Sequence, residues 1–239
     1  MHTSIRWNAE TLKEFVEKRI AITSGIKSGS FETLWRQIFP ETIYNTYYKL
    51  EESSFDYILR HTMLRPRQLQ IHLSHLASRY RGLPIDPSMV PKSVADSSRM
   101  LAKYFIDEYN LDHPNLERFI LMFEQKGNVM EFKNFRDIVA AALKRYNGVE
   151  HGVDVDEKID VLYTMGFFGV IRFQESGDYL QDQNYYPPTR ESRRHHVDFF
   201  FRKAFTKVSS RLDDQSLVAI HPMFSEYANL KMHGSLIIG

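Results

Sequence analysis

Arg65 and Arg67 flank Pro66 and form the most suggestive short pattern in the chain. Proline suits the first turn of a helix, where its missing N–H would have no partner, so both arginines are predicted to lie at a helix start. A guanidinium can hold a phosphate group through two parallel hydrogen bonds. The pattern is therefore suited to a contact with a phosphate group. The alternative is a solvated helix start with ordinary surface arginines.

The densest basic stretch begins at Arg190 and is predicted to form a polar loop between two strands. There it could act as a basic wing that lies along a DNA backbone. Acidic residues between Glu175 and Asp214 offset much of its charge, so a solvated charged face is the alternative interpretation. The residues predicted to contact nucleic acid are Arg190, Arg193, Arg194, His195, Arg202 and Lys203.

Histidine pairs raise the question of a metal site or a catalytic base. His72 and His75 are three residues apart, and His195 precedes His196, but no His-Glu-x-x-His motif occurs. Zinc needs three or four converging ligands, so we expect no metal. His221 has no Gly-x-Ser-x-Gly turn to work with and is predicted to be a buried histidine that bonds a carbonyl. We expect no catalytic residues and no enzyme activity in this chain.

Composition excludes several classes of protein. The 239 residues are 43% hydrophobic, which is enough for one large domain or two small ones. A net charge of +1 gives no general attraction to nucleic acid, and the absence of cysteine excludes disulfides and thiolate metal sites. No stretch approaches the roughly 20 apolar residues that span a bilayer, and residues 1–8 lack a signal-peptide core. A cytoplasmic protein without membrane contact is expected.

Hydrophobic spacing predicts a mainly α protein, with a helical bundle followed by a small α+β winged-helix-like domain. The expected domains are a helical lid-like part (1–83), a second helical part (84–150) and the winged-helix-like part (151–239). Strands are expected at 167–173 and 197–201, and a final helix is expected from Pro222. The other predicted helices are 9–22, 31–39, one around 55–59, one from Pro66, 92–109, one from Pro114, 132–146 and 156–165.

Nearly the whole chain carries a series of short sequence patterns, and their order along the chain is more informative than any single pattern. They are Ile5-Arg-Trp7, Leu12, Arg19-Ile20, Trp35, Phe39-Pro40, Leu64-Arg-Pro-Arg-Gln-Leu69, Ser98, Leu101, Glu108, Pro114, Leu162-Tyr163, Gly166-Phe-Phe-Gly-Val170 and Ile220-His-Pro-Met-Phe224. Together they resemble the region C-terminal to the ATPase core in bacterial P-loop ATPases of the STAND-like kind. The resemblance implies a helical lid over a nucleotide, with Arg65 and Arg67 near the phosphate end as nucleotide-sensing residues. It also implies a winged-helix-like domain that senses or transmits, and a link to defence or signalling.

The chain departs from that family in one decisive respect. It has no Gly-x-x-x-x-Gly-Lys-Ser/Thr, so no backbone loop can hold phosphates, and ATP hydrolysis is not implied. ATP and Mg²⁺ are expected only if an upstream P-loop domain is joined to the chain. The leading hypothesis is a non-catalytic regulatory region that contacts a protein partner or such a domain, with an oligomer possible. The alternative is a DNA-binding regulator of the winged-helix type.

Overall fold

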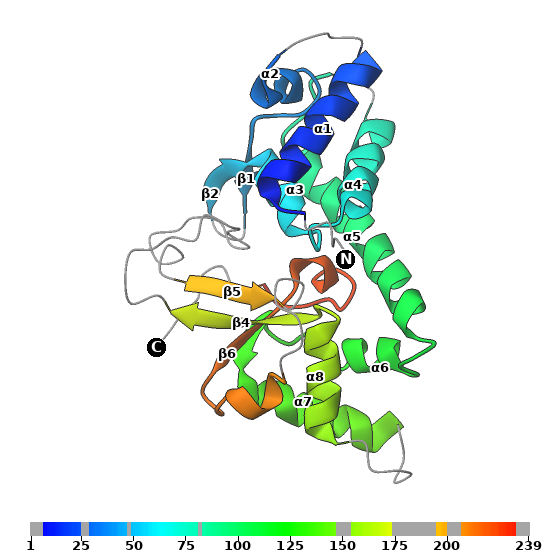
Figure 1. Cartoon of the computed structure of the whole chain (residues 1–239), viewed down its shortest axis with the longest axis vertical. Coiled ribbons are helices and arrows are strands. Elements are labelled where there is room, and N and C mark those ends of the chain that lie inside the picture. Colours follow the sequence, from blue (N-terminus) through cyan, green and yellow to red (C-terminus); the bar gives the residue numbers. More distant parts are fainter. Residues whose placement is uncertain are drawn as a thin grey trace, which may run out of the picture. The chain divides into compact units, whose positions relative to one another are not determined.

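The structure is a computed structural model, and its described part divides into two compact units (Figure 1). The division falls between Ser97 and Ser98, inside helix α5 (Met89–Tyr109). The described part contains eight α-helices and small antiparallel sheets, and its C-terminal region is α+β, which confirms the expected fold class. The described residues are 7–24, 29–46, 49–80, 83–146, 154–173, 195–199 and 207–232.

The first unit is mostly helical. Its elements are α1 (Ala9–Ser24), α2 (Phe31–Arg36), β1 (Thr42–Asn45), β2 (Leu50–Ser53), α3 (Ser54–Arg60), α4 (Pro66–Arg79) and the first part of α5.

Short polar side chains start the first three helices of this unit. The carboxamide oxygen of Asn8 accepts from Thr11 N at 2.8 Å ahead of α1. The hydroxyls of Ser30 and Ser53 accept from backbone N–H groups in the first turns of α2 and α3. Such caps satisfy N–H groups that have no partner inside the helix.

Aromatic rings form much of the core of the first unit. The Trp35 ring lies 5.4 Å from Phe31, 5.3 Å from Phe55 and 4.3 Å from Phe39, measured between centroids. Its indole N–H is not lost to the core, because Nε1 donates to Ser54 Oγ at 2.9 Å. Rings of this size contribute large buried apolar areas, and a buried indole usually finds such an acceptor.

A two-stranded hairpin, which the sequence did not lead us to expect, lies between α2 and α3. β1 pairs antiparallel with β2, and Ile43 is opposite Glu52. Glu52 is buried, pairs with Arg60 of α3, and accepts from Asn45 Nδ2 at 2.6 Å. A carboxylate with two such partners can tolerate burial. From the sequence alone, two adjacent glutamates suggest an exposed loop, because the partners that allow Glu52 to be buried belong to other elements.

The second unit combines helices with one sheet. It contains the rest of α5, α6 (Leu116–Leu121), β3 (Val129–Glu131), α7 (Phe132–Tyr146), α8 (Val155–Thr164), β4 (Phe168–Phe173), β5 (His195–Phe199), η3 (Ser209–Arg211), β6 (Leu217–Ile220) and η4 (Pro222–Phe224).

The sheet of the second unit is antiparallel, with the order β3-β6-β4-β5. Phe168 pairs with Ile220 across β4 and β6, and Val129 pairs with Ala219 across β3 and β6. Strand β6 therefore joins two strands that are separated along the chain by α7 and α8. Buried phenylalanines form much of the core of this unit, with ring centroids 4.4 Å apart for Phe135 and Phe168 and 5.0 Å apart for Phe167 and Phe224.

Several predicted bounds need correction. The helix expected from Pro222 is wrong: a three-residue 3₁₀ turn forms there, and the chain reverses so that Lys231 N donates to Lys126 O at 2.8 Å. The strand expected at 197–201 lies two residues earlier, where it pairs with β4. Helix α5 begins at Met89, because Pro91 fits within its first turn. The three-domain division stays a prediction.

We predict that removing one partner of the buried Glu52–Arg60 pair strongly destabilises the fold. Glu52→Ala leaves a buried guanidinium without its carboxylate and should lower the free energy of unfolding by about 3–5 kcal/mol. Glu41→Ala removes the carboxylate of an exposed pair with Arg36 and should cost less than about 1 kcal/mol. Urea unfolding measures both, and equal losses would contradict this account of the hairpin.

Candidate functional site

Arg65 and Arg67 lie at the start of α4, as the sequence predicted. Arg65 is the N-cap residue with an extended backbone (φ −100°, ψ 124°), and Pro66 is the first helical residue. Both arginine side chains are exposed. The first N–H groups of a helix have no partner within it, and the helix dipole favours negative charge at this end. Two guanidiniums beside such an end give the chemistry of a phosphate contact.

The turn that precedes α4 is held by its own hydrogen bonds. Leu64 is buried and has a φ of 54°, a left-handed conformation that is unfavourable for a bulky side chain. Its N–H donates to Thr62 Oγ1 at 3.2 Å, and the Met63 N–H donates to Gln68 Oε1 at 2.7 Å. These bonds join the turn to the first turn of the helix. The backbone direction at Arg65 is therefore fixed by the surrounding structure, at a strain cost on the order of 1–3 kcal/mol.

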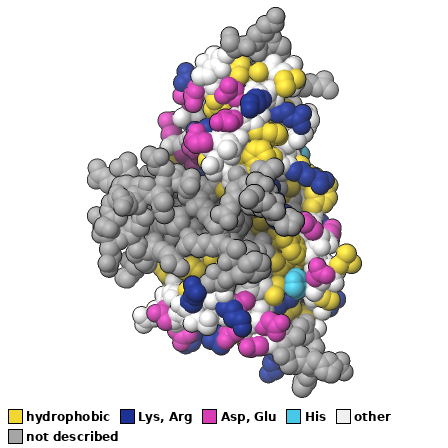
Figure 2. Space-filling model, in the orientation of Figure 1, with side chains coloured by type: hydrophobic (Ala, Val, Ile, Leu, Met, Phe, Trp, Pro, Cys, Tyr) yellow, Lys and Arg dark blue, Asp and Glu magenta, His cyan; other side chains and the backbone are white. Residues whose placement is uncertain are grey.

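Arg65 and Arg67 differ from most other described arginines in their lack of partners. Neither guanidinium forms an ion pair or a hydrogen bond with another described residue. On the face shown in Figure 2, Lys and Arg side chains lie among acidic ones wherever the residues are described. The arginines that do have a carboxylate partner are Arg36, Arg60, Arg79, Arg99 and Arg136.

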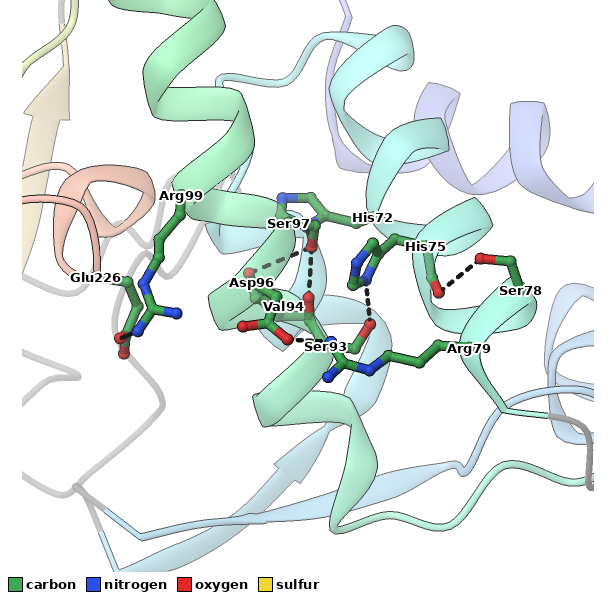
Figure 3. A network of polar contacts seen from close by, with 10 residues as sticks. All are labelled: His72, His75, Ser78, Arg79, Ser93, Val94, Asp96, Ser97, Arg99 and Glu226. Carbon is green, nitrogen blue, oxygen red and sulfur yellow. Dashed lines mark hydrogen bonds and ion pairs between the residues drawn. The ribbon is translucent and has the colours of Figure 1, made fainter.

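Polar contacts hold α4 against the first part of α5 (Figure 3). His72 Nδ1 lies 2.7 Å from Ser97 Oγ, and His75 Nδ1 lies 2.9 Å from Ser93 Oγ. Arg79, at the last turn of α4, pairs with Asp96. Ser93 and Ser97 are fully buried, so the helices meet closely at these small residues. The contacts fix the position of the helix that carries the two arginines.

The buried His72 is uncharged in the folded protein. Burial lowers its pKa to about 4, and the backbone hydrogen bond to His61 opposes this only in part. His72 Nε2 lies 3.3 Å from His61 O. The other ring nitrogen, Nδ1, lies 2.7 Å from Ser97 Oγ, and this hydroxyl also donates to Ser93 O at 2.7 Å. Each nitrogen of the neutral imidazole thus has a partner, which offsets the cost of burying it.

Only the spacing of its members could have pointed to this network before the structure was known. His72 and His75 are three residues apart on α4, and Ser93 and Ser97 are four apart on α5, so each pair lies on one helix face. Two such faces predict a contact only when the helices are known to pack together. The histidine pair was expected on a surface or interface, but His72 is buried.

The predicted nucleic-acid residues Arg190, Arg193, Arg194, Arg202 and Lys203 lie outside the described residues. His195 is the first residue of β5, and its side chain is not among those described. These residues therefore stay predictions. Among the described residues, no three histidine, aspartate or glutamate side chains are placed to hold a metal ion. No described helix has the length and apolar character that crossing a membrane requires.

His221 is fully buried, as predicted, but its contact differs from the one expected. Its Nδ1 accepts from the Met223 backbone N–H at 3.1 Å, so the ring caps the 3₁₀ turn at Pro222. The expected bond to a carbonyl near this turn is replaced by one to an N–H. The first N–H groups of a helical turn find no carbonyl within the turn, which makes an accepting nitrogen the better partner.

Comparison with known families gives one match. Residues 10–101 match the family described as the FunZ-associated C-terminal helical domain. The match covers α1 to α4 and part of α5, including Arg65, Arg67 and the His72 network. It covers well under half of the chain, and nothing in it links the chain to a STAND ATPase. No curated protein and no solved structure matches the chain.

We predict that acid weakens the first unit through His72. The folded state lowers the pKa of His72 from 6.5 to about 4, so the unfolded chain takes up this proton first as the pH falls. The contribution of His72 is complete above about pH 6.5 and is lost toward pH 4, by up to about 1.4 kcal/mol per pH unit.

Urea unfolding of the wild type and of His72→Gln, at steps between about pH 7 and pH 5, measures this loss. The wild type should lose more unfolding free energy over that range than the variant. Parallel pH dependence in the two proteins would mean that His72 is not held uncharged.

Proposed function

We propose that this chain is a non-catalytic regulatory region, in which α4 contacts the phosphates of a nucleotide bound by a domain outside these residues. The observation that carries the proposal is the pair of exposed arginines at the start of α4, which have no partner among the described residues. The nucleotide and its Mg²⁺ would be held elsewhere, because the chain has no phosphate-binding loop of its own.

The family match adds support of a limited kind. Its description names a C-terminal helical domain that is associated with FunZ. A helical domain described by its association with something else fits an accessory role better than an independent enzyme. The first helices of the chain lie within the matched residues, and they are also the part that the STAND-like resemblance assigns to a lid. The STAND-like identity of the partner domain is part of the proposal.

The chemistry of such a contact follows from the site. A nucleoside triphosphate differs from a diphosphate by its terminal phosphate, which adds negative charge. Guanidiniums bind such a group with paired hydrogen bonds. Arg65 and Arg67 would therefore favour the bound position of α4 only while that phosphate is present. The buried contacts between α4 and α5 would carry the change into α5, because they fix one helix against the other.

The second unit supports contact with a protein rather than with DNA. The order α6, β3, α7, α8, β4, with β6 between β3 and β4, is the arrangement expected of a winged-helix-like domain. In DNA-binding relatives of this arrangement the second of two consecutive helices faces the duplex. The exposed residues at the start of α8 include Asp154 and Glu157, whose charges repel phosphates.

Winged-helix-type DNA binding through the Arg190 to Lys203 stretch remains the alternative proposal. Those residues lie outside the described part of the chain, so no described geometry favours it. DNA binding led by phosphate contacts weakens steeply as salt is added. Binding of a duplex that falls with salt and is lost when Arg193 and Arg194 become alanine would favour this alternative.

We predict that Arg65→Ala with Arg67→Ala abolishes the response to nucleotide. The native protein, isolated with whatever domain binds the nucleotide, should show slower amide hydrogen exchange in the first turn of α4 when ATP replaces ADP. The double variant should show no such difference, because the terminal phosphate has lost both donors.

The matched control is Arg145→Ala with Arg211→Ala. These exposed arginines lie in the second unit, form no ion pair with a described residue, and give the same change of net charge. The control should keep the wild-type difference. An ATP-dependent difference that survives in the Arg65, Arg67 variant would refute the proposed contact.

A further inference from the structure

Arg19 of α1 is an exposed arginine that is held in place without being neutralised. Its Nη2 donates to Gln70 Oε1 of α4 at 3.3 Å, and its Cζ lies 5.7 Å from the centroid of the Phe15 ring. A carboxamide oxygen and an aromatic face orient a guanidinium, but neither carries a full negative charge. Arg19 therefore has a defined position, and it keeps its charge and most of its N–H donors.

The described arginines of the first unit fall into two groups. Three of them pair with a carboxylate, as described above. The three that pair with no described carboxylate are Arg19, Arg65 and Arg67. All three belong to α1 or to the start of α4, and the contact between Arg19 and Gln70 joins these two helices.

The same contact brings Arg19 to the exposed side of α4 that carries Arg67. Arg67 and Gln70 are three residues apart on this helix and both are exposed, so their Cβ atoms are neighbours about 5–6 Å apart. Helices α1 and α4, which lie beside each other in Figure 1, thus present two guanidiniums on one surface of the first unit. Like charges at neighbouring positions repel each other, and an anion bound by both would offset that repulsion.

We propose that Arg19 is a further phosphate-contacting residue, so that α1 and α4 together bind a chain of linked phosphate groups. The inference rests on the proposed function, in which Arg65 and Arg67 contact the terminal phosphate of a nucleotide. It adds that Arg19 contacts the phosphate next to the terminal one. A second phosphate places further negative charge beside the first, and a guanidinium supplied by another helix suits it, because each guanidinium can give two parallel hydrogen bonds to one group.

The test is a titration of the whole chain with inorganic triphosphate at constant ionic strength, followed through the NMR signals of the arginine side-chain N–H groups. The signals of Arg19, Arg65 and Arg67 should shift together. Arg19→Gln should weaken triphosphate binding at least about threefold, because a charged donor becomes a neutral one. Arg19→Lys should give an intermediate affinity, because it keeps the charge and loses the planar pair of donors. Orthophosphate, which has no second group for Arg19, should bind equally to the wild type and to Arg19→Gln.

The matched control is Lys18→Gln, which removes the adjacent exposed cation and gives the same change of net charge. It should leave triphosphate binding close to the wild-type value. The inference is overturned by an Arg19 signal that triphosphate does not shift, by equal affinities in the wild type and Arg19→Gln, or by equal weakening in Arg19→Gln and Lys18→Gln. None of these results removes the proposed function, because the ATP-dependent exchange in the native protein is tested through Arg65 and Arg67.

Discussion

The position of α4 depends on a buried, uncharged imidazole. His72 joins the turn ahead of α4 to the middle of α5, because Nε2 lies 3.3 Å from His61 O and Nδ1 lies 2.7 Å from Ser97 Oγ. A charged imidazole at this site would be severely penalised, and an apolar side chain would leave the buried Ser97 hydroxyl with one partner fewer. Polar contacts of defined geometry therefore hold the helix that carries the exposed arginines.

The two units treat buried charge in opposite ways. In the first, Glu52 meets Arg60 and Asn45, so a carboxylate and a guanidinium compensate each other inside the protein. In the second, Lys158 contacts the face of an aromatic ring and no carboxylate of the described residues. A compensated pair specifies how a hairpin packs on a helix, whereas an uncompensated cation is costly to stability.

Sequence reasoning succeeded where local signals decide the structure. The bounds of α7 match the prediction because its apolar positions repeat at helical spacing. Helix α4 starts at Pro66, as predicted, because a proline lacks the N–H that would have no partner in the first turn of a helix. It failed where distant partners decide. The β1–β2 hairpin depends on Arg60 and Asn45 to bury Glu52, and the chain after Pro222 turns back to meet Lys126 rather than forming a helix. The location of Arg65 and Arg67 was predictable, but their lack of partners was visible only in the structure.

The central claim is that this chain acts beside a nucleotide-binding domain. Native mass spectrometry of the protein isolated from its source tests it most directly, when combined with sequencing of whatever is joined to or bound by the chain. The account predicts a species well above 28.2 kDa that contains a phosphate-binding loop, either in the same polypeptide or in a tightly bound partner. A single species of 28.2 kDa, with no nucleotide-binding protein attached, would contradict it.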